Sequence, residues 1–588
     1  MSRYSVTWCV FSLAVLGLSA GCGKVTGGLA DAAAPGGSHD GGTDAGTDTG
    51  TDAPPELRQV TVAVEVGGGG GSVTSDVGGV SCGQACSAMV LDGTPITFTA
   101  VTPGGSAFMG WRGDAKTCGA RTTCVVNVAG AALNVGARFA QKGTAAWNVQ
   151  IGSLVSDSAR VVGDNDGNSY LLASHGGDIM FDGTPVAGGV SILAKLSPAG
   201  DVLWKRSLSA DAGFLKLAVV PSTGDIALLG TYSKTVDLGG PSTLTLPGAD
   251  TGDYFAVKYA GSDGHFLWQH PIHLDDTDDP GVQGFAVSAA GDVLVAGAFN
   301  TSFNLGDGSV TTTAGLAEAF MGVLASADGA VQWKKRIGGA DSGIFINDAA
   351  FDSNGFVILG GNFANTMNLG GAVLTPNGAG RRDAFVARFF GATGQLSWQR
   401  QVGGTGDDSV EALVVDTNNN VTVAVQYEVI ATEAVTFAGN TLTGTGTGTD
   451  IVIGQVSSVN GFNWAKRYGG SGGATPAGFD VPTDLVLLAD GNLALAGYFY
   501  SASLAFGGTT LSNAGLTDAF VARLSIATGD ASFVSRLFGT GFDTVTSVGR
   551  AGNNVVVAGG FQNQTDFVGT LLTAAGGQDG YTIAVPLP

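Results

Sequence analysis

The stretch Ala349-Ala-Phe-Asp-Ser-Asn-Gly-Phe-Val-Ile-Leu-Gly-Gly361 contains two short apolar runs that are joined by an Asp-Ser-Asn-Gly turn. Asn, Asp and Gly tolerate the left-handed backbone that a tight hairpin requires, so the stretch predicts two antiparallel strands. A further strand is predicted before it, at Trp333-Lys-Lys-Arg-Ile-Gly-Gly339, and another after it, at Asp383-Ala-Phe-Val-Ala-Arg388. A short Leu369-Gly-Gly371 segment lies between the hairpin and the last strand. The unit therefore predicts four strands.

This unit of about 65 residues returns seven times along the chain. Repetition at a fixed period indicates units that cannot bury their apolar faces alone and therefore share a core with their neighbours. Four strands per unit and seven units match a β-propeller, whose four-stranded blades surround a channel. A parallel β-helix is the alternative, but its rungs are shorter and its strands are not antiparallel. The repeats are marked by Trp147, Trp204, Trp268, Trp333, Trp398, Trp464 and Phe533.

The repeat landmarks also resemble a known family. Phe506-Gly-Gly508 and Asp518-Ala-Phe-Val-Ala-Arg523 are typical examples, and the next Trp usually follows a Gly by four residues. These motifs resemble the SBBP-type β-propeller repeat of exported bacterial proteins over nearly all of residues 146–588, with Ser191 in place of the usual Asp in the first repeat. We expect Trp147–Ile151 to pair with Tyr581–Val585 and close the ring, because closure removes exposed sheet edges.

Composition supports an exported all-β protein and argues against a nucleic-acid partner. The chain has 588 residues, 97 glycines and only 13% charged residues, which favours short strands and tight turns over amphipathic helices. Its net charge is −22, from 27 basic and 49 acidic residues. Nucleic acids are bound through clustered Lys and Arg, which are scattered here, so we expect no nucleic-acid partner.

The N-terminus predicts export and lipid anchoring. Arg3 precedes an apolar stretch, and Leu18-Ser-Ala-Gly-Cys22 follows it. Residues 1–21 read as a signal peptide, and the segment resembles a bacterial lipobox, which implies that Cys22 is acylated. Gly23 follows, and by the same resemblance the absence of Asp there implies sorting to the outer membrane. Residues 22–57 are Gly, Thr, Asp, Ala and Pro with almost nothing to bury, so they predict a flexible acidic tether.

Residues 58–141 predict a small β module. Val60-Thr-Val-Ala-Val-Glu-Val66 and Ile96-Thr-Phe-Thr-Ala-Val101 alternate apolar and polar positions, as half-buried strands do. An even number of cysteines in an exported chain implies disulfides, and four cysteines allow three pairings. A zinc site is the alternative, but tight C-x2-C knuckles are lacking. The module's cysteines are Cys82, Cys86, Cys118 and Cys124.

The order of landmarks in this module resembles the internalin-type B-repeat modules of bacterial surface proteins. It runs through Cys82-Gly-Gln-Ala-Cys86, Gly93-Thr, Phe108-Met-Gly-Trp111 and Ala137-Arg-Phe139. The resemblance implies a spacer or stalk with two local disulfides, Cys82 with Cys86 and Cys118 with Cys124. Residues 142–588 then form the propeller of seven repeats.

An acidic residue recurs shortly after each Trp strand, and equivalent positions in a propeller lie on one face. Carboxylates on one face predict cation binding, with Ca²⁺ as the candidate, or attraction of a basic partner. Alternatively, each Asp caps its own turn through hydrogen bonds to the backbone, which is the simpler interpretation. A weaker metal candidate is the run Asp275, Asp276, Asp278 and Asp279, which also reads as a solvated loop. The possible ligand face comprises Asp157, Asp211, Asp278, Asp341, Asp407, Asp480 and Asp543.

No motif for catalysis or a cofactor accompanies these residues. Gly469-Gly-Ser471-Gly-Gly473 matches G-x-S-x-G formally, but no His follows residue 273 and no α/β sheet is predicted. We therefore expect a lipid-anchored envelope protein whose propeller is a non-catalytic binding or scaffold module for a protein or glycan, at the cell surface. The alternatives are a periplasm-facing accessory lipoprotein of an outer-membrane complex and a propeller hydrolase or lyase. Partner contacts are expected at 427–436 and 471–480, which interrupt the repeat pattern.

Overall fold

The computed structural model describes residues 56–588, with gaps at 68, 83–84, 247–251, 276–280, 313–316, 340–342, 431–433, 438–439, 444–447, 460, 471–477 and 568. The chain divides into Met1–Pro54 and Pro55–Pro588, and the described residues all belong to the second unit. The predicted signal peptide, Cys22 and nearly all of the predicted tether lie outside the described residues. Within them the fold is all-β, as predicted, with a single short 3₁₀ turn, η1 (Lys116–Cys118).

The first described element is a module of two four-stranded sheets. Phe98, Trp111 and Phe139 are fully buried in its core, and the indole Nε1 of Trp111 donates to the carbonyl oxygen of Arg121 at 2.7 Å. One sheet has the order β4-β1-β8-β6 and the other β3-β2-β5-β7. The strands are β1 (Leu57–Gly67), β2 (Ser72–Ser75), β3 (Ser81–Cys82), β4 (Ala85–Leu91), β5 (Pro95–Val101), β6 (Ser106–Gly113), β7 (Thr123–Asn127) and β8 (Leu133–Gln141).

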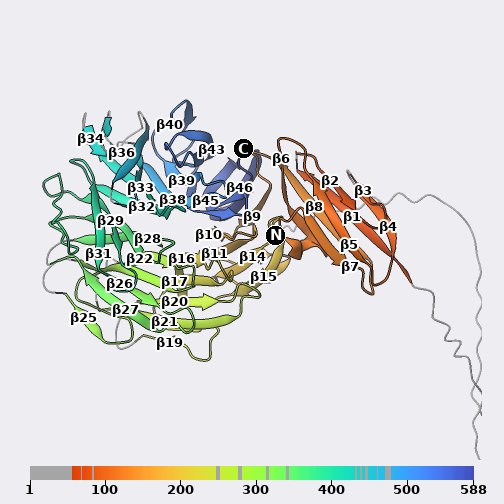
Figure 1. Cartoon of the computed structure of the whole chain (residues 1–588), viewed down its shortest axis with the longest axis horizontal. Helices are drawn as coiled ribbons and strands as arrows, with labels where there is room; N and C mark the ends of the chain where they lie inside the picture. Colours follow the sequence, from red (N-terminus) through yellow and green to blue (C-terminus); the bar gives the residue numbers. More distant parts are fainter. Residues whose placement is uncertain are drawn as a thin grey trace, which may run out of the picture. The chain divides into compact units, whose positions relative to one another are not determined.

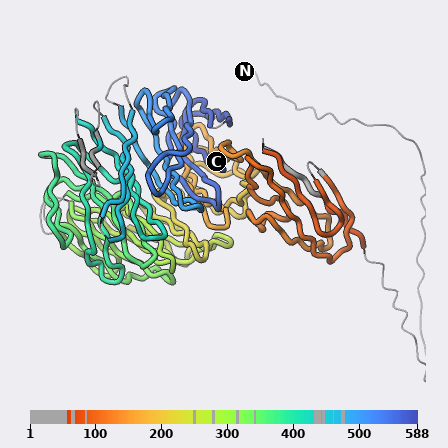
Figure 2. The backbone as a smooth tube through the Cα atoms, turned by 45° about the horizontal axis from the view of Figure 1, so that its top comes forward, coloured from red at the N-terminus to blue at the C-terminus, as the bar shows by residue number. Residues whose placement is uncertain are grey.

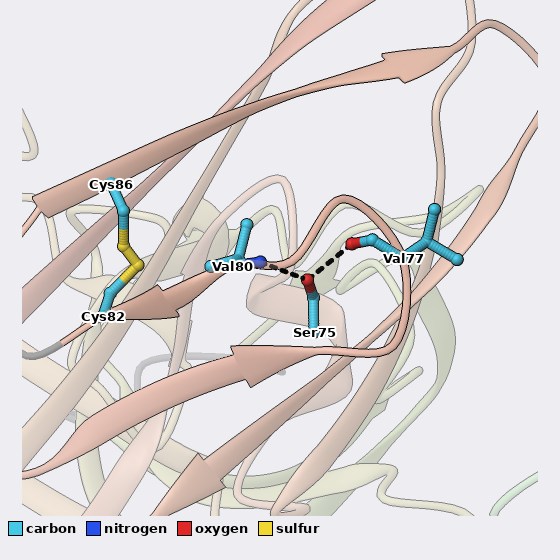
Figure 3. Close-up of a disulfide and its surroundings, with 5 residues drawn as sticks. All are labelled: Ser75, Val77, Val80, Cys82 and Cys86. Carbon is cyan, nitrogen blue, oxygen red and sulfur yellow. Dashed lines mark hydrogen bonds between the residues drawn. A yellow bond between two sulfur atoms is a disulfide. The ribbon is translucent and has the colours of Figure 1, made fainter.

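Two local disulfides join neighbouring elements in this module, β3 to β4 and η1 to β7. Cys82 pairs with Cys86 and Cys118 with Cys124, with Cα atoms 5.8 and 5.6 Å apart. Figure 3 shows the first of them beside the β2–β3 turn, where Ser75 Oγ donates to the carbonyl oxygen of Val77 at 2.5 Å and accepts from the backbone N–H of Val80 at 3.1 Å. The pairing implied by the family resemblance is therefore the one observed.

The strands that follow pair antiparallel in groups of four, one group for each sequence repeat. Each group begins at the centre of the propeller and ends at its edge, and we number these groups as blades 1 to 7 in chain order. Blade 1 is β10 (Asp157–Gly163), β11 (Ser169–His175), β14 (Ile192–Leu196) and β15 (Val202–Ser207); blade 2 is β16 (Ala212–Val219), β17 (Ile226–Tyr232), β20 (Asp253–Tyr259) and β21 (Phe266–Leu274); blade 3 is β22 (Gly281–Val287), β23 (Val293–Phe299), β26 (Glu318–Leu324) and β27 (Val331–Ile337). Blade 4 is β28 (Ile344–Phe351), β29 (Val357–Phe363), β30 (Asp383–Phe389) and β31 (Leu396–Val402); blade 5 is β32 (Asp408–Val415), β33 (Val421–Val429), β36 (Gly448–Val456) and β37 (Phe462–Gly470). Blade 6 is β38 (Asp480–Leu487), β39 (Leu493–Phe499), β42 (Asp518–Leu524) and β43 (Ala531–Gly539); blade 7 is β44 (Thr544–Ala551), β45 (Asn554–Phe567), β46 (Thr570–Val585) and β9 (Trp147–Ile151).

Short hairpins extend the outer edges of some blades. In blades 3 and 6 the hairpin between the second and third strands pairs with the last strand of the preceding blade, β24 with β21 and β40 with β37. Covering an edge strand in this way leaves fewer unpaired backbone groups at the rim. The hairpins are β12 (Ile179–Phe181) with β13 (Thr184–Val186), β18 (Thr235–Val236) with β19 (Leu244–Thr245), β24 (Ser302–Asn304) with β25 (Ser309–Thr311), β34 (Ala434–Phe437) with β35 (Asn440–Thr443), and β40 (Ser503–Phe506) with β41 (Thr509–Ser512).

The ring closes through the last blade. β9 pairs antiparallel with β46, with Trp147 opposite Ala584 and Ile151 opposite Gly580, as predicted from the sequence. Innermost strands of successive blades contact each other, and β44 contacts β10. Figures 1 and 2 show the backbone passing from yellow through green to blue around the propeller. Closure therefore pairs the edge strand of the C-terminal repeat with an N-terminal strand.

The hydrophobic core lies between blades. The buried cluster that contains Met321 also contains Phe385, so it joins blades 3 and 4, and the cluster of Trp398 and Val425 joins blades 4 and 5. The same holds for each remaining pair of neighbouring blades. The shared core expected of stacked repeats is thus present at each interface.

The module also contacts blade 1. The guanidinium of Arg112 in β6 binds both carboxylate oxygens of Asp201, with Nη2–Oδ1 at 2.7 Å and Nε–Oδ2 at 3.0 Å. Met109 and Ala140 belong to the same buried cluster as residues of blades 1 and 7. The module is thereby attached by a bidentate ion pair and by apolar packing.

Candidate functional site

Bulges in the innermost strands place polar side chains at the centre of the propeller. Six of these strands carry a register shift at the same position, and β10 is the exception among the described strands. A bulge turns an extra side chain away from the regular alternation and is a common device next to binding sites. The bulged residues are Leu215, Gln283, Asn347, Glu411, Thr483 and Thr546.

Some residues next to the bulges bind the following blade. Asp348 Oδ2 accepts from the backbone N–H of Leu413 at 2.9 Å, and Asp484 Oδ2 accepts from the N–H of Val548 at 2.8 Å. Burial raises the pKa of Asp348, and it raises the pKa of Asp484 to about 6. These carboxylates therefore connect neighbouring innermost strands at the expense of their own hydration.

A channel cavity of about 220 Å³ runs past these residues. Arg160 and Lys216 supply positive charge, and Asp348, Glu411 and Asp484 supply negative charge. Lys216 Nζ lies 3.3 Å from the carbonyl oxygen of Asn347 and 3.9 Å from Asp348 Oδ1, so it reaches from blade 2 to blade 4. Burial lowers the pKa of Arg160 and raises that of Glu411.

A larger mouth cavity, about 750 Å³, opens beside blades 3 to 6 and shares Glu411 with the channel cavity. Its volume is in the range of small-ligand sites, but its lining is mostly polar. Carboxamides, carboxylates and hydroxyls predominate over two aromatic rings. The lining residues are Gln283, Phe345, Asn347, Asn362, Arg382, Asp407, Asp408, Ser409, Glu411, Gln426, Glu428, Thr449 and Phe479.

Ser409 is the centre of a hydrogen-bond network on the inner wall of the mouth cavity. Its Oγ accepts from Asn347 Nδ2 at 2.7 Å and from Asn362 Nδ2 at 3.0 Å. Ser409 is also hydrogen-bonded to the carboxylate of Glu411. Because its oxygen already accepts twice, its hydroxyl is the donor in this third bond. The network orients two carboxamides and one carboxylate around a single hydroxyl.

Ion pairs fix the rim of the mouth cavity. Arg381 Nη1 lies 2.9 Å from Asp407 Oδ2 and 3.1 Å from Glu428 Oε2, and the backbone N–H of Asp407 donates to Glu428 Oε2 at 2.7 Å. The guanidinium of Arg382 lies 4.4 Å from the centre of the Phe345 ring. These rim charges are largely neutralised by each other.

The Asp residues that the sequence placed on one face have different environments. Asp157 is buried and accepts from Ser153 N at 2.6 Å and Gly176 N at 3.0 Å, which is turn-capping geometry. Asp480 and Asp543 are also buried: Asp480 Oδ2 accepts from Gly470 N at 2.7 Å and Asp543 Oδ2 from Thr565 Oγ1 at 3.2 Å.

The other members of this set are exposed or outside the described residues. Asp211 and Asp407 are exposed. In blade 5 the buried capping position belongs to Asp408, which accepts from Gly404 N at 2.7 Å and Glu428 N at 3.0 Å, so Asp407 is one residue out of register. Asp278 and Asp341 lie outside the described residues.

A second set of acidic residues was missed by sequence reasoning. These residues are buried at the third strand of blades 2 to 7 and contact a side chain of the fourth strand, as when Arg336 Nε lies 3.2 Å from Glu318 Oε2 and Gln150 Nε2 donates to Asp579 Oδ2 at 2.7 Å. The signal was a Gln or Arg three residues after Trp147, Trp333, Trp398, Trp464 and Phe533. The acidic residues are Asp253, Glu318, Asp383, Asp450, Asp518 and Asp579.

The weaker metal candidate cannot be placed as a group. Asp275 accepts from the hydroxyl of Ser302, whereas Asp276, Asp278 and Asp279 lie outside the described residues. Within the described part of the chain, no three His, Cys, Asp or Glu side chains are grouped so that they could hold a metal ion. No helix in that part is long and apolar enough to cross a membrane. Each of the two segments predicted to contact a partner contributes one residue to the lining of the mouth cavity: Glu428 from 427–436 and Phe479 from 471–480.

Comparison with known proteins concerns the fold alone. No protein-family model and no curated protein matches the chain. Among solved structures, the Pan2 WD40 domain of Neurospora crassa is similar at TM-score 0.35 and 9% identity, covering 73% of this chain and 90% of its own. BamB of Moraxella catarrhalis gives TM-score 0.31 and 12% identity over 74% of this chain and 100% of its own. The polysaccharide lyase Uly1 gives 0.36 and 11% over 74% and 91%. The assignment as a β-propeller rests on the strand pairings described above.

Proposed function

We propose that this chain is a lipid-anchored envelope protein that displays its propeller at the cell surface as a non-catalytic binding module. The observation that carries the proposal is the mouth cavity: it is large enough for a ligand group, and it is lined by polar side chains held by hydrogen bonds. The lipobox-like sequence ending at Cys22 supports the anchor. The partner is a protein or a glycan.

A binding role is supported by how the carboxylates nearest the channel are used. Asp348 and Asp484 each accept from a backbone N–H of the following blade, so they fix the innermost strands. Glu411 is hydrogen-bonded to Ser409. A propeller hydrolase or lyase would instead use one of these carboxylates as acid or base, and substituting it by the amide would abolish the activity.

The two family assignments belong to the same proposal. We assign residues 58–141 to the internalin-type B-repeat modules, as a spacer, and residues 142–588 to the SBBP-type repeats. Two local disulfides and four strands per repeat agree with these assignments.

The proposal is tested by proteolysis of the full chain in intact and then permeabilised cells, with an antibody against the propeller. Surface display predicts loss of the propeller from intact cells. A Cys22→Ala variant is the control, because it should abolish incorporation of labelled palmitate and release the chain from the membrane fraction. Protection until permeabilisation would overturn surface display and favour a periplasm-facing accessory lipoprotein.

A further inference from the structure

The mouth cavity contains a buried hydrogen-bond acceptor that lacks a donor among the described residues. The side chain of Asn362 is only 8% exposed, and its Nδ2 donates to Ser409, but its carbonyl oxygen has no partner among the described residues. Asn347 Nδ2 donates to Ser409 Oγ and to the backbone carbonyl oxygen of Val410. The side-chain oxygen Oδ1 is therefore the group that Asn347 can offer to a ligand. A buried acceptor without a donor is unfavourable, and a ligand that supplies N–H groups relieves this cost.

One carboxylate of the cavity, that of Glu411, forms no close ion pair with another described residue. Asp407 and Glu428 share Arg381 at the rim, and Asp408 accepts from two backbone N–H groups. In the described part of the chain no ion pair within 4 Å joins Glu411 to a Lys, Arg or His; burial raises its pKa, and the charge of Lys216 in the channel cavity lowers it from a longer distance. A carboxylate in this half-enclosed position attracts a cation more strongly than it would in water.

The repeats themselves show that these residues are not required by the fold. Among the bulged residues of the six innermost strands, Glu411 is the only charged one. In the second strand, at the position opposite the first or second residue of the innermost strand, carboxamides occur only in blades 4 and 5. That position is occupied by Ser174, Thr231, Ala298, Asn362, Gln426, Tyr498 and Gly560. The other blades have the same four-stranded pairing without these groups, so their concentration at one cavity points to a ligand.

We propose that the mouth cavity binds a Lys or Arg side chain on an extended segment of a partner protein, with Glu411 receiving the cationic group and the carbonyl oxygens of Asn347 and Asn362 accepting its N–H donors. Phe479 at the rim is 39% exposed and can pack against the aliphatic part of such a side chain. The net charge of −22 favours the approach of a basic segment. This inference rests on the proposed binding function and names its ligand. A neutral glycan would bring no cationic group to Glu411.

The test uses the full-length lipidated chain in detergent and a fluorescein-labelled hexa-arginine peptide, followed by fluorescence anisotropy at 50 and 300 mM NaCl. We expect saturable binding that Glu411→Gln weakens at least tenfold. The matched control is Asp166→Asn, which removes the same charge from an exposed turn between β10 and β11 and should change affinity less than twofold. Gln283→Glu adds a carboxylate to the exposed wall of the cavity and should tighten binding, a gain that misfolding cannot produce.

Three results would overturn the inference: no saturable binding, equal effects of Glu411→Gln and Asp166→Asn, or displacement of the peptide by a neutral oligosaccharide. Its failure is distinguishable from failure of the proposed function. A propeller that is cleaved on intact cells but does not bind the peptide leaves surface display standing, and a protected propeller that binds it leaves the basic ligand standing.

Discussion

The indole of Trp268 in blade 2 lies directly against Gly329 in blade 3, where a Cβ atom would stand 2.6 Å from the ring. Trp268 Nε1 also donates to the carbonyl oxygen of Ser326, in the same turn, at 3.0 Å. Gly329 stands four residues before Trp333 of blade 3, and Trp333 lies against Gly394 of blade 4 in the same way. The Gly-x-x-x-Trp spacing of the sequence therefore reflects blade packing, because Gly329 and Gly394 each lie against the Trp of the preceding blade.

Substituting this glycine tests the contact. Gly329 has φ of +73°, so Gly329→Ala introduces both backbone strain and a clash with the indole. Gly491→Ala is the matched control, because Gly491 has φ of +83° and nothing within 4 Å of the added Cβ. We expect Gly329→Ala to lower the free energy of unfolding by about 1–3 kcal/mol more than the control. Urea unfolding of the full chain measures the difference, and equal losses would contradict the role of the indole.

The tryptophans are not equivalent, and their replacement by Phe should show this. Trp464 Nε1 donates to the carbonyl oxygen of Ile526 at 2.9 Å, whereas Trp398 Nε1 has no partner in the described part of the chain. Trp464→Phe removes a hydrogen bond and leaves a carbonyl group unpaired, but Trp398→Phe removes none. We expect Trp464→Phe to cost about 1 kcal/mol more in unfolding free energy. Comparable losses in thermal and urea unfolding would show that packing alone governs both sites.

Much of this architecture could be predicted because it depends on local and periodic signals. The hairpin turns, the Trp spacing and the need to remove exposed edges predict four strands per repeat and the pairing of β9 with β46. The same contact occurs where the ring closes. Gly143 stands four residues before Trp147, and a Cβ atom added to Gly143 would lie 3.4 Å from the Phe533 ring of blade 6. What the sequence did not reveal was which blade each Gly contacts, because that depends on tertiary stacking.

The hydrogen bond of Asp484 to the next blade gives a third prediction. Asp484→Ala leaves the N–H of Val548 without an acceptor and should lower the free energy of unfolding by about 1–3 kcal/mol. Asp484→Asn keeps an acceptor oxygen and avoids the cost of a buried charge, so it should lose much less or gain stability. The comparison is made by urea unfolding at pH 7.5. A loss in the Asn variant as large as in the Ala variant would mean that the charge, and not the acceptor, is required.

The candidate site was harder to predict than the fold. A bulge shifts the pairing by one residue, so Glu411 and Asn347 line the mouth cavity at positions where regular alternation places a different residue. The same sensitivity to register explains why the sequence pattern predicts Asp407 as the repeating acidic residue although Asp408 occupies the buried position. Asp407 and Asp408 are adjacent and chemically identical, so the sequence pattern does not distinguish them. The pattern of Gln or Arg three residues after the Trp was present and could have located the second acidic set.

The fourth prediction concerns pH. Burial raises the pKa of Asp480 and of Asp543 to about 7, while both have pKa values of about 4 in the unfolded chain. Between these two values the folded protein retains protons that the unfolded chain has released. The stabilising contribution is therefore complete below about pH 4 and is lost as pH rises through about 7. The slope can reach about 1.4 kcal/mol per pH unit for each group within this window.

Asp480→Asn and Asp543→Asn should flatten this dependence, because a carboxamide keeps an acceptor for Gly470 N or Thr565 Oγ1 without titrating. We expect each variant to exceed the parent protein in unfolding free energy by about 1.4 kcal/mol at pH 5 and by more at pH 8, because the parent loses this contribution progressively above about pH 4. Asp166→Asn, at an exposed position, should follow the parent curve throughout. Urea unfolding at pH 5, 6, 7 and 8 gives the four curves. Parallel curves for parent and buried variants would mean that these carboxylates are ionised in the folded protein across the range, with their charge stabilised by the hydrogen bonds they accept.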